Sequence, residues 1–339
     1  MKRHLVPVLF GAATAFADTP QWQVQVVQSP VVTERTFSAG DELSGIASLN
    51  GKDCVVVSNE TRCAQMAVLE RDPWRLRAGE VIPLSAASGD EMDLEAVAAN
   101  SKAHCYYVLG SHAVSKQKGK RRPDQEVLAR IPADPKTGKP TADRPEDIKT
   151  TTLMEILRGV PELNGTLGRP LQQNGLNLEG MTCQDGKLFI GCRGPSLEGA
   201  VPVLEMEAEA LFKSPPPKPT VSQVQFGKGL GIRDMASLRD GNLLILTGSS
   251  GSPSSEKFPS TQHYDGDKSF SLWLWKPGGG AAPTRIAPLP AAPGSAEGLL
   301  VVEESPEGIL VLVLFDGAYN GAPKLLKLVP PEKAKAAPR

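Results

Sequence analysis

The chain repeats one short design five times, and this repeat limits the possible folds more than any other feature of the sequence. Each copy has a polar or charged residue, a short apolar segment, a turn and then a strongly apolar segment. The copies begin at Leu43, Leu94, Leu178, Ile232 and Ala296. Repeats of this kind predict small β-units, each of which can bury its apolar faces only against its neighbours.

Turn residues between the two apolar segments predict hairpins. Asn50-Gly51, Asp185-Gly186 and Asp240-Gly241 favour the positive φ of tight turns. A third apolar segment follows in every copy and a fourth in most, but the last copy lacks its fourth. The alternating segment 22–27 can supply that strand and so remove both exposed sheet edges. The sequence therefore predicts an all-β fold, a β-propeller of five four-stranded blades closed by the N-terminal strand. A six-bladed propeller and a pair of β-sandwiches are the alternatives.

The chain divides into three parts along its length. A basic start, a short apolar run and Ala15-Phe16-Ala17 predict a secretory signal over residues 1–17, cleaved after Ala17, and hence a periplasmic or secreted protein. Residues 18–330 are expected to form a single propeller domain, with a helical insertion at about 132–177. A flexible tail is expected over 331–339. No later apolar stretch is long enough to span a bilayer.

Composition narrows the range of partners. Lys and Arg number 37 against 38 Asp and Glu, for a net charge of −1. Such a balance argues against a nucleic-acid partner, because proteins that bind nucleic acids usually have a strongly positive surface. We expect a monomer whose partner is a small molecule. The five cysteines leave at least one thiol unpaired.

The aligned first positions of the repeat predict one polar site. In a propeller the innermost strands of all blades line a central channel, and the second strands return to the face where the first begin. The aligned residues are therefore expected to meet at one mouth of the channel: Ser44, Glu95, Glu179, Arg233 and Glu297. Oxygen ligands suit Ca²⁺ or another divalent cation, so we assign a possible metal role to Asp93, Glu95, Glu179 and Glu297. The residues expected to bind ligand are Arg193, Arg233, Asp316, Lys118 and Lys120, and His112 is the candidate acid/base.

Two functions are compatible with this site. The first is an exported binding propeller that takes a small or anionic ligand at the channel mouth, with or without a divalent cation. The alternative is a metal-assisted hydrolase of phosphoesters or other esters. A purely structural role, in which the polar residues satisfy channel waters, is the third interpretation.

Several stretches resemble a known family. They are LEAVAA with YYVLGSH, NGLNLEGM with LFIGCRGP, and GIRDMASLRDGNLLIL. Together they are similar to the bacterial family of domain of unknown function 3616 (DUF3616), from about Leu43 to Asp316. The resemblance implies a β-propeller related in appearance to phytase-like and esterase-like propellers. It supplies no catalytic residues. The first repeat has Ser44 where the second, third and fifth have an acid, which weakens a metal role for the ring.

Overall fold

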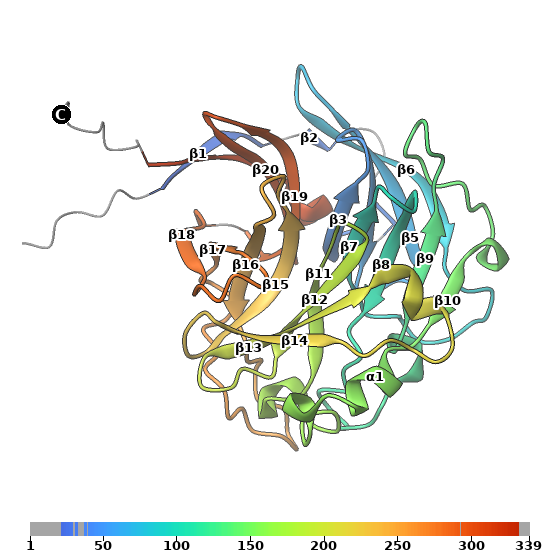
Figure 1. Ribbon diagram of the computed structural model, residues 1–339, viewed down its shortest axis with the longest axis vertical. Helices are drawn as coiled ribbons and strands as arrows, with labels where there is room; N and C mark the ends of the chain where they lie inside the picture. The colour runs from blue at the N-terminus through green and yellow to red at the C-terminus, as the bar shows by residue number, and fades with distance from the viewer. Residues whose placement is uncertain (1–21, 30, 33–36, 39, 292, 332–339) are drawn as a thin grey trace, which may run out of the picture.

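The computed structural model describes residues 22–331, except 30, 33–36, 39 and 292. The predicted signal, residues 1–17, and residues 332–339 of the predicted tail lie outside the described residues. Figure 1 shows five antiparallel sheets arranged around a central axis, with the first strand of each blade innermost. The five-bladed propeller predicted from the repeat is confirmed.

The blades follow one another along the chain. Blade one contains β3 (Leu43–Ser48), β4 (Asp53–Ser58), β5 (Cys63–Glu70) and β6 (Arg75–Pro83). Blade two contains β7 (Leu94–Asn100), β8 (Cys105–Gly110), β9 (Leu128–Pro132) and β10 (Lys149–Thr151). Blade three contains β11 (Asn177–Gln184), β12 (Lys187–Gly194), β13 (Ala200–Glu207) and β14 (Thr220–Gln225). Blade four contains β15 (Leu230–Ser237), β16 (Leu243–Ser249), β17 (Ser271–Trp275) and β18 (Thr284–Pro288).

Blade five closes the ring with a strand from each end of the chain. It contains β19 (Ser295–Ser305), β20 (Gly308–Asp316), β21 (Lys324–Val329) and β1 (Gln23–Gln28). The outermost pair is antiparallel, with Val24 opposite Leu328. A two-residue strand, β2 (Val31–Val32), then pairs in parallel with β6 at the outer edge of blade one. The N-terminal segment thus completes one blade and extends the next.

The core lies between blades. Ala47 of β3 packs toward β7 with Val97, whereas Ile46 packs on the other side with Leu300 of β19. Successive side chains of a strand point to opposite faces, so each inner strand contributes to two interfaces. The strands after the turns are buried on both faces, as their continuous apolar sequences indicate.

The segment between β9 and β11 has two roles. It contains β10, the fourth strand of blade two, for which no clear pattern is present in the sequence. It also contains the short helix α1 (Met154–Arg158), which confirms the helical character expected of the insertion, and the apolar residues in and beside it are buried: Leu153, Ile156, Leu157 and Val160. They pack against blades two and three.

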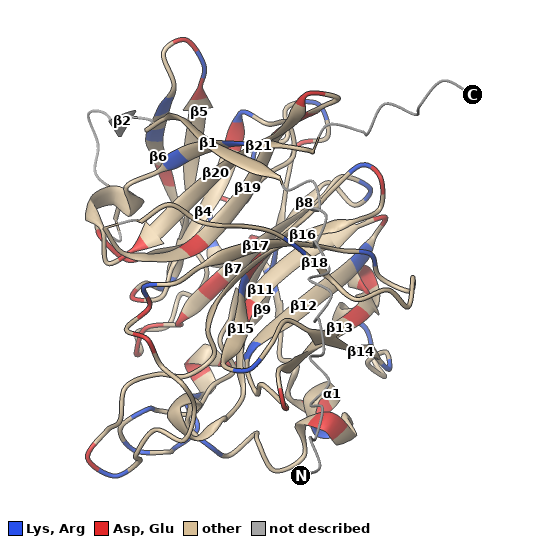
Figure 2. Cartoon of the chain, turned by 90° about the vertical axis from the view of Figure 1, so that its left-hand side faces the viewer, with Lys and Arg blue, Asp and Glu red and all other residues tan. Residues whose placement is uncertain are grey.

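Further features bear on the setting of the protein. All five cysteines carry free thiols. In the described part of the chain, no helix has the length and apolar character needed to cross a membrane. Figure 2 shows Lys and Arg interspersed with Asp and Glu over the strand ends and loops, rather than gathered into one field.

Candidate functional site

Each innermost strand carries a β-bulge near its start. In β3, Leu43 faces Ser58 and Gly45 faces Val57, which leaves Ser44 without a partner on β4. The other four strands skip the equivalent residue in the same way. We call these five residues the bulge ring: Ser44, Glu95, Glu179, Arg233 and Glu297. All five are buried. A bulge re-aims a side chain out of the regular alternation, so the fold turns these five residues away from the blade interfaces.

Small residues after the bulge allow the inner strands to approach closely. A Cβ on Gly45 would lie 2.9 Å from the Cα of Ala96, and one on Gly180 would lie 2.5 Å from Ile232 Cγ2. In blade four the residue directly after the bulge is Asp234 instead of a small residue. Its carboxylate accepts the backbone N–H of Met235 at 2.8 Å and of Leu299 at 2.7 Å, and so joins blades four and five.

Arg233 is almost completely buried, with 1% of its surface exposed. Its Nε lies 3.2 Å from Glu179 Oε2, its Nη2 bonds the Glu297 carboxylate, and its Nη1 lies 3.7 Å from Asp267 Oδ1. Burial alone would lower the pKa of Arg233, but Glu179 and Glu297 outweigh it and raise the pKa. The guanidinium therefore remains charged.

A second bulge brings Arg193 to the same cluster. On β12 the register passes from Gly194 to Cys192 and leaves Arg193 unpaired. Its Nη1 donates to Glu179 Oε1 at 3.1 Å, its Nε to the Ser249 carbonyl at 3.0 Å and its Nη2 to the Gly251 carbonyl at 2.8 Å. Arg193 therefore ties Glu179 to the loop that follows β16.

Two ring carboxyls have strongly shifted acidity. Burial, followed by the charges of Glu179, Asp93 and Glu297, raises the pKa of Glu95 well above its ordinary value. Burial raises the pKa of Glu297 to about 7, although Arg233 opposes the shift. Both shifts favour the neutral form of the carboxyl, which can donate a hydrogen bond.

Polar atoms without partners are concentrated at this mouth. Within the described residues, those on the ring or beside it that also lack a close ion-pair contact are Ser44 Oγ, Asn177 Oδ1 and Asp316 Oδ1, and Arg233 Nη1 has only the 3.7 Å contact with Asp267. Buried polar groups almost always have a hydrogen-bond partner, supplied by protein, water or ligand. The mouth therefore offers unused donors and acceptors from blades one, three, four and five.

An acidic cavity of about 430 Å³ opens beside Glu95. It is lined by Asn59, Glu60, Glu91 and Asp93. Burial raises the pKa of Asp93. Asp316 lies at the blade-five side of the mouth, where burial and the neighbouring charges of Glu297 and Glu42 raise its pKa to about 10. Carboxyl groups dominate this part of the site.

The predicted acid/base, His112, lies in a different setting. Its Nδ1 is 2.8 Å from the Gly110 carbonyl, and its Nε2 accepts the backbone N–H of Leu153 at 3.2 Å. Burial lowers its pKa to about 4. Both ring nitrogens are thus used to hold the segment that enters α1, which leaves neither for a substrate and gives the catalytic role no support.

The basic stretch that follows His112, residues 116–122, has part of its charge matched by ion pairs. Lys118 and Lys120 are exposed, while Arg121 pairs with Glu126 and Arg122 with Glu91. This loop packs closely against the β16–β17 loop: a Cβ on Gly119 would lie 2.6 Å from the Phe258 ring. The ligand-binding roles of Lys118 and Lys120 remain predictions.

The ring carboxylates surround Arg233 rather than a common ion position. In the part of the chain that the structure describes, no group of three His, Cys, Asp or Glu side chains is arranged to hold a metal ion. The roles assigned to Asp93, Glu95, Glu179 and Glu297 as Ca²⁺ ligands remain predictions, and Arg193 and Arg233 supply positive charge at this site.

Sequence reasoning missed three contributors to the site. Asp267 and Tyr264 come from the β16–β17 loop, and the Tyr264 hydroxyl donates to Asp267 Oδ2 at 3.2 Å. Gln172 joins three loops at this face: its Nε2 donates to the Lys116 carbonyl at 2.7 Å and to Ser255 Oγ at 3.1 Å. These residues lie in loops outside the repeat, so alignment of the copies carried no signal for them.

Comparisons with solved structures give distant similarities only. An α-L-arabinofuranosidase from Podospora anserina is 13% identical, with a TM-score of 0.49 and 92% of this chain and 98% of that chain covered. A PQQ-bound aldose sugar dehydrogenase from Streptomyces coelicolor is 15% identical, with a TM-score of 0.42 and 92% and 99% covered. No statement about a ligand follows from them.

Sequence comparison identifies the family. No curated protein matches the chain. Residues 127–322, more than half of the sequence, match the family described as a protein of unknown function (DUF3616). This match includes Arg193, Arg233 and Glu297, and it agrees with the resemblance seen in the repeat motifs. The chain, a five-bladed β-propeller with a buried arginine–carboxylate cluster at one mouth of its channel, therefore belongs to the DUF3616 family.

Proposed function

We propose that this propeller binds a small polar ligand, uncharged or cationic, at the mouth formed by the bulge ring and the acidic cavity. The observation that carries the proposal is the acidic cavity, at a mouth where buried polar atoms of Ser44, Asn177 and Asp316 lack hydrogen-bond partners. A ligand with several hydroxyl or amino groups would supply the missing partners, since unpaired buried polar groups are costly.

Charge favours such a ligand over an anion. Glu179, Glu297 and Asp267 face Arg193 and Arg233, so the positive charge is already matched. The adjacent cavity is lined by carboxyls, which accept hydrogen bonds, and the only described cation paired with this lining, Arg122, is matched by Glu91. Of the small and anionic ligands expected from the sequence, the geometry therefore supports a small one without net negative charge.

Ester hydrolysis is the second candidate, and one observation favours it. Burial and the charge of Glu179 raise the pKa of Glu95, whereas the charge of Glu179 is compensated by two arginines. Enzymes often place two carboxyl groups in different environments, so that their pKa values differ and one acts as the acid and the other as the base. In this reading Glu95 would donate a proton to the leaving group. Ester hydrolysis is tested by assaying the wild type and Glu95→Gln on a panel of carboxylic and phosphate esters, with Ca²⁺ and with chelator. We expect turnover by the wild type and its loss in Glu95→Gln.

Ligand binding is tested by affinity selection with a defined mixture of uncharged, cationic and anionic metabolites, followed by mass spectrometry. We expect retention of uncharged or cationic compounds, and its loss in Asp93→Asn and Glu95→Gln. Glu303→Gln is the control, because Glu303 is half-exposed and pairs with Arg71 away from the mouth. Retention of anions alone, or retention that survives both mouth substitutions, would contradict the proposal.

We also infer that the protein is exported and acts as a monomer. The basis is the sequence of residues 1–17 and the closure of all five blades within one chain. Cell fractionation with mass measurement of the mature N-terminus tests the first part, with processing after Ala17 expected. A full-length cytoplasmic product would overturn it, and sedimentation tests the second part.

A further inference from the structure

His112 caps a helix that lies elsewhere in the chain. It follows β8 and is 2% exposed, and its Nε2 accepts the backbone N–H of Leu153, the residue directly before α1. The first N–H groups of a helix have no partner within the helix, so a side chain often supplies one. Here the cap comes from a buried imidazole of blade two. We call residues 152–163, which contain α1, the α1 segment.

The two partners of the imidazole fix its protonation state. The Gly110 carbonyl, 2.8 Å from Nδ1, can only accept a hydrogen bond, so Nδ1 carries the proton. The Leu153 N–H can only donate, so Nε2 must present its lone pair. The cap therefore requires the neutral imidazole, because a proton on Nε2 would set two donors against each other.

The charges around His112 do not hold the imidazolium. The charged groups on the neighbouring elements are Glu126 and Arg121 beside β8, Asp93 before β7, Glu179 on β11 and Glu155 on α1. Glu126 favours the imidazolium, but its carboxylate is paired with Arg121. Burial outweighs Glu126 and lowers the pKa of His112 from 6.5 to about 4.

The α1 segment depends on contacts with the rest of the fold. The helix has five residues, too few to be stable by itself. A groove of about 400 Å³ lies beside it, lined by Ile156, Gly159 and Val160 together with the proline run 215–217. The segment therefore has open space along one side, and it is held by its buried apolar residues and by the cap on Leu153.

We propose that His112 is a pH-sensitive latch that holds the α1 segment on blades two and three at neutral pH and releases it in acid. On acidification a proton from water binds Nε2, the bond from the Leu153 N–H is lost, and the segment opens while the blade strands stay paired. The neighbouring Ser111 N–H donates to the Asp93 carbonyl at 3.0 Å, so the latch adjoins the wall of the acidic cavity.

The direction of the pH effect follows from the two states of the ring. In the open segment His112 takes up a proton at its ordinary pKa of 6.5, whereas the closed segment resists protonation down to about 4. The open state therefore binds more protons in this range, and the ratio of open to closed should rise about tenfold for each pH unit below 6.5.

Hydrogen–deuterium exchange of the mature chain from pH 7 to pH 4.5 tests the latch, after correction for the effect of pH on the exchange chemistry itself. We expect opening of the α1 segment to increase about 100-fold between pH 6.5 and pH 4.5, while the amides of β16 keep their protection. His112→Gln should remove this dependence, because an amide does not titrate. His263→Gln, at an exposed histidine, is the matched control and should keep it.

NMR titration of the wild type keeps the proposal testable if His112→Gln does not fold. The His112 ring signal and the Leu153 amide signal should change with one shared midpoint. Opening of the segment that does not depend on pH, or that persists unchanged in His112→Gln, would overturn the proposal. So would separate midpoints of the two signals, or loss of protection in β16 together with the α1 segment.

Discussion

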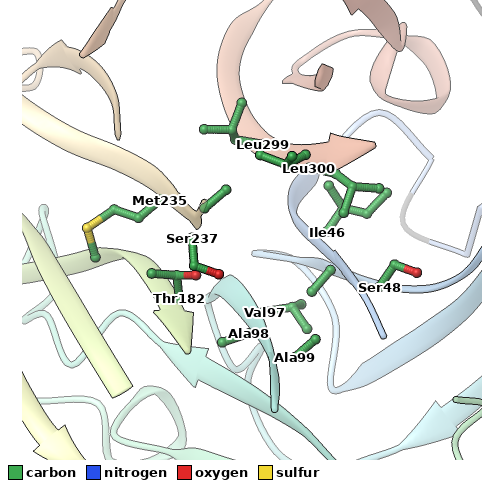
Figure 3. Close-up of a pocket in the computed structure, with 13 residues that line it drawn as sticks. Ile46, Ser48, Val97, Ala98, Ala99, Thr182, Met235, Ser237, Leu299 and Leu300 are labelled. Atoms are coloured by element: carbon green, nitrogen blue, oxygen red, sulfur yellow. The ribbon is translucent and has the colours of Figure 1, made fainter. Parts of the chain in front are cut away.

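At one end of the central channel, the inner strands present the bulge ring. At the other end, the same five strands present a small cavity of about 120 Å³ lined mainly by apolar side chains, among them Ile46, Val97, Met235 and Leu299 (Figure 3). Here the register of β3 and β7 is regular, and side chains alternate between neighbouring blades. The bulge near the start of each inner strand therefore gives the channel a charged end, while the other end of the same strands is mainly apolar.

The difference shows how each end is stabilised. The buried charges of the bulge ring compensate one another, so removal of one leaves a buried charge of opposite sign without a partner. Side chains at the apolar end contribute through area and packing, which are independent of pH. The predictions below test that contrast.

Removing the ring cation should give the largest effect. We expect Arg233→Met to lower the free energy of unfolding by about 3 to 5 kcal/mol at pH 7, because it leaves buried carboxylates unpaired. The loss should be smaller at pH 5, where Glu297 and its neighbours can take up protons. Urea unfolding at pH 5 and pH 7 measures this loss of stability, and Arg239→Met, at an exposed residue, is the control. An equal loss at the two pH values would contradict the coupling.

A deletion at the apolar end should cost less and should not depend on pH. Ile46 is buried beside the small cavity. We expect Ile46→Ala to destabilise by about 2 to 4 kcal/mol through lost burial and an enlarged cavity. The same urea series at pH 5 and pH 7 should give equal losses. A clear pH dependence would show that the two ends are coupled.

Glu95 should make the charged end less stable as pH rises. Its pKa is raised in the folded state, so the native chain holds the proton after the unfolded chain has released it. Stability therefore falls as pH rises above about 4.5, the ordinary value, toward the folded pKa. Glu95→Gln should match the wild type near pH 4 and exceed it by about 1 to 2 kcal/mol at pH 8. Thermal unfolding across this range measures the difference, and parallel curves would count against it.

The smallest effect is expected for an isosteric change at the apolar end. Thr182 is buried at the small cavity. Thr182→Val keeps the shape and removes one hydroxyl, so stability should change by less than about 1 kcal/mol. Calorimetry at pH 7 measures it. A loss as large as that of Ile46→Ala would show that this end also depends on a polar network.

The sequence predicted the parts of this molecule that repeat. Alignment of five copies gave the blade number, the closing strand and the position of Ser44, Glu95, Glu179, Arg233 and Glu297. It could not show the bulges, because a bulge is a property of pairing between strands. A small residue after the aligned position, Gly45, Ala96, Gly180 or Gly298, was the only local sign of them.

The unrepeated parts were harder to predict. The strand β10 is three residues long and lies in a long connection, so its pattern is weak. Asp267 reaches Arg193 and Arg233 from a loop whose conformation depends on tertiary contacts. His112 was a plausible acid/base by residue type, but only the fold shows that both of its nitrogens are used by the backbone.

The pairing of β1 with β21 also sets the order in which the molecule can be completed. Val24 and Leu328 lie at opposite ends of the sequence, so their contact forms only after the last blade has been synthesised. Until then β1 has no partner strand, and blade five lacks its outer edge. The parallel pair of β2 with β6 can hold the N-terminal segment against blade one while the rest of the chain emerges. Ring closure is thus a late, long-range step of folding, and the first strand made is among the last to be used.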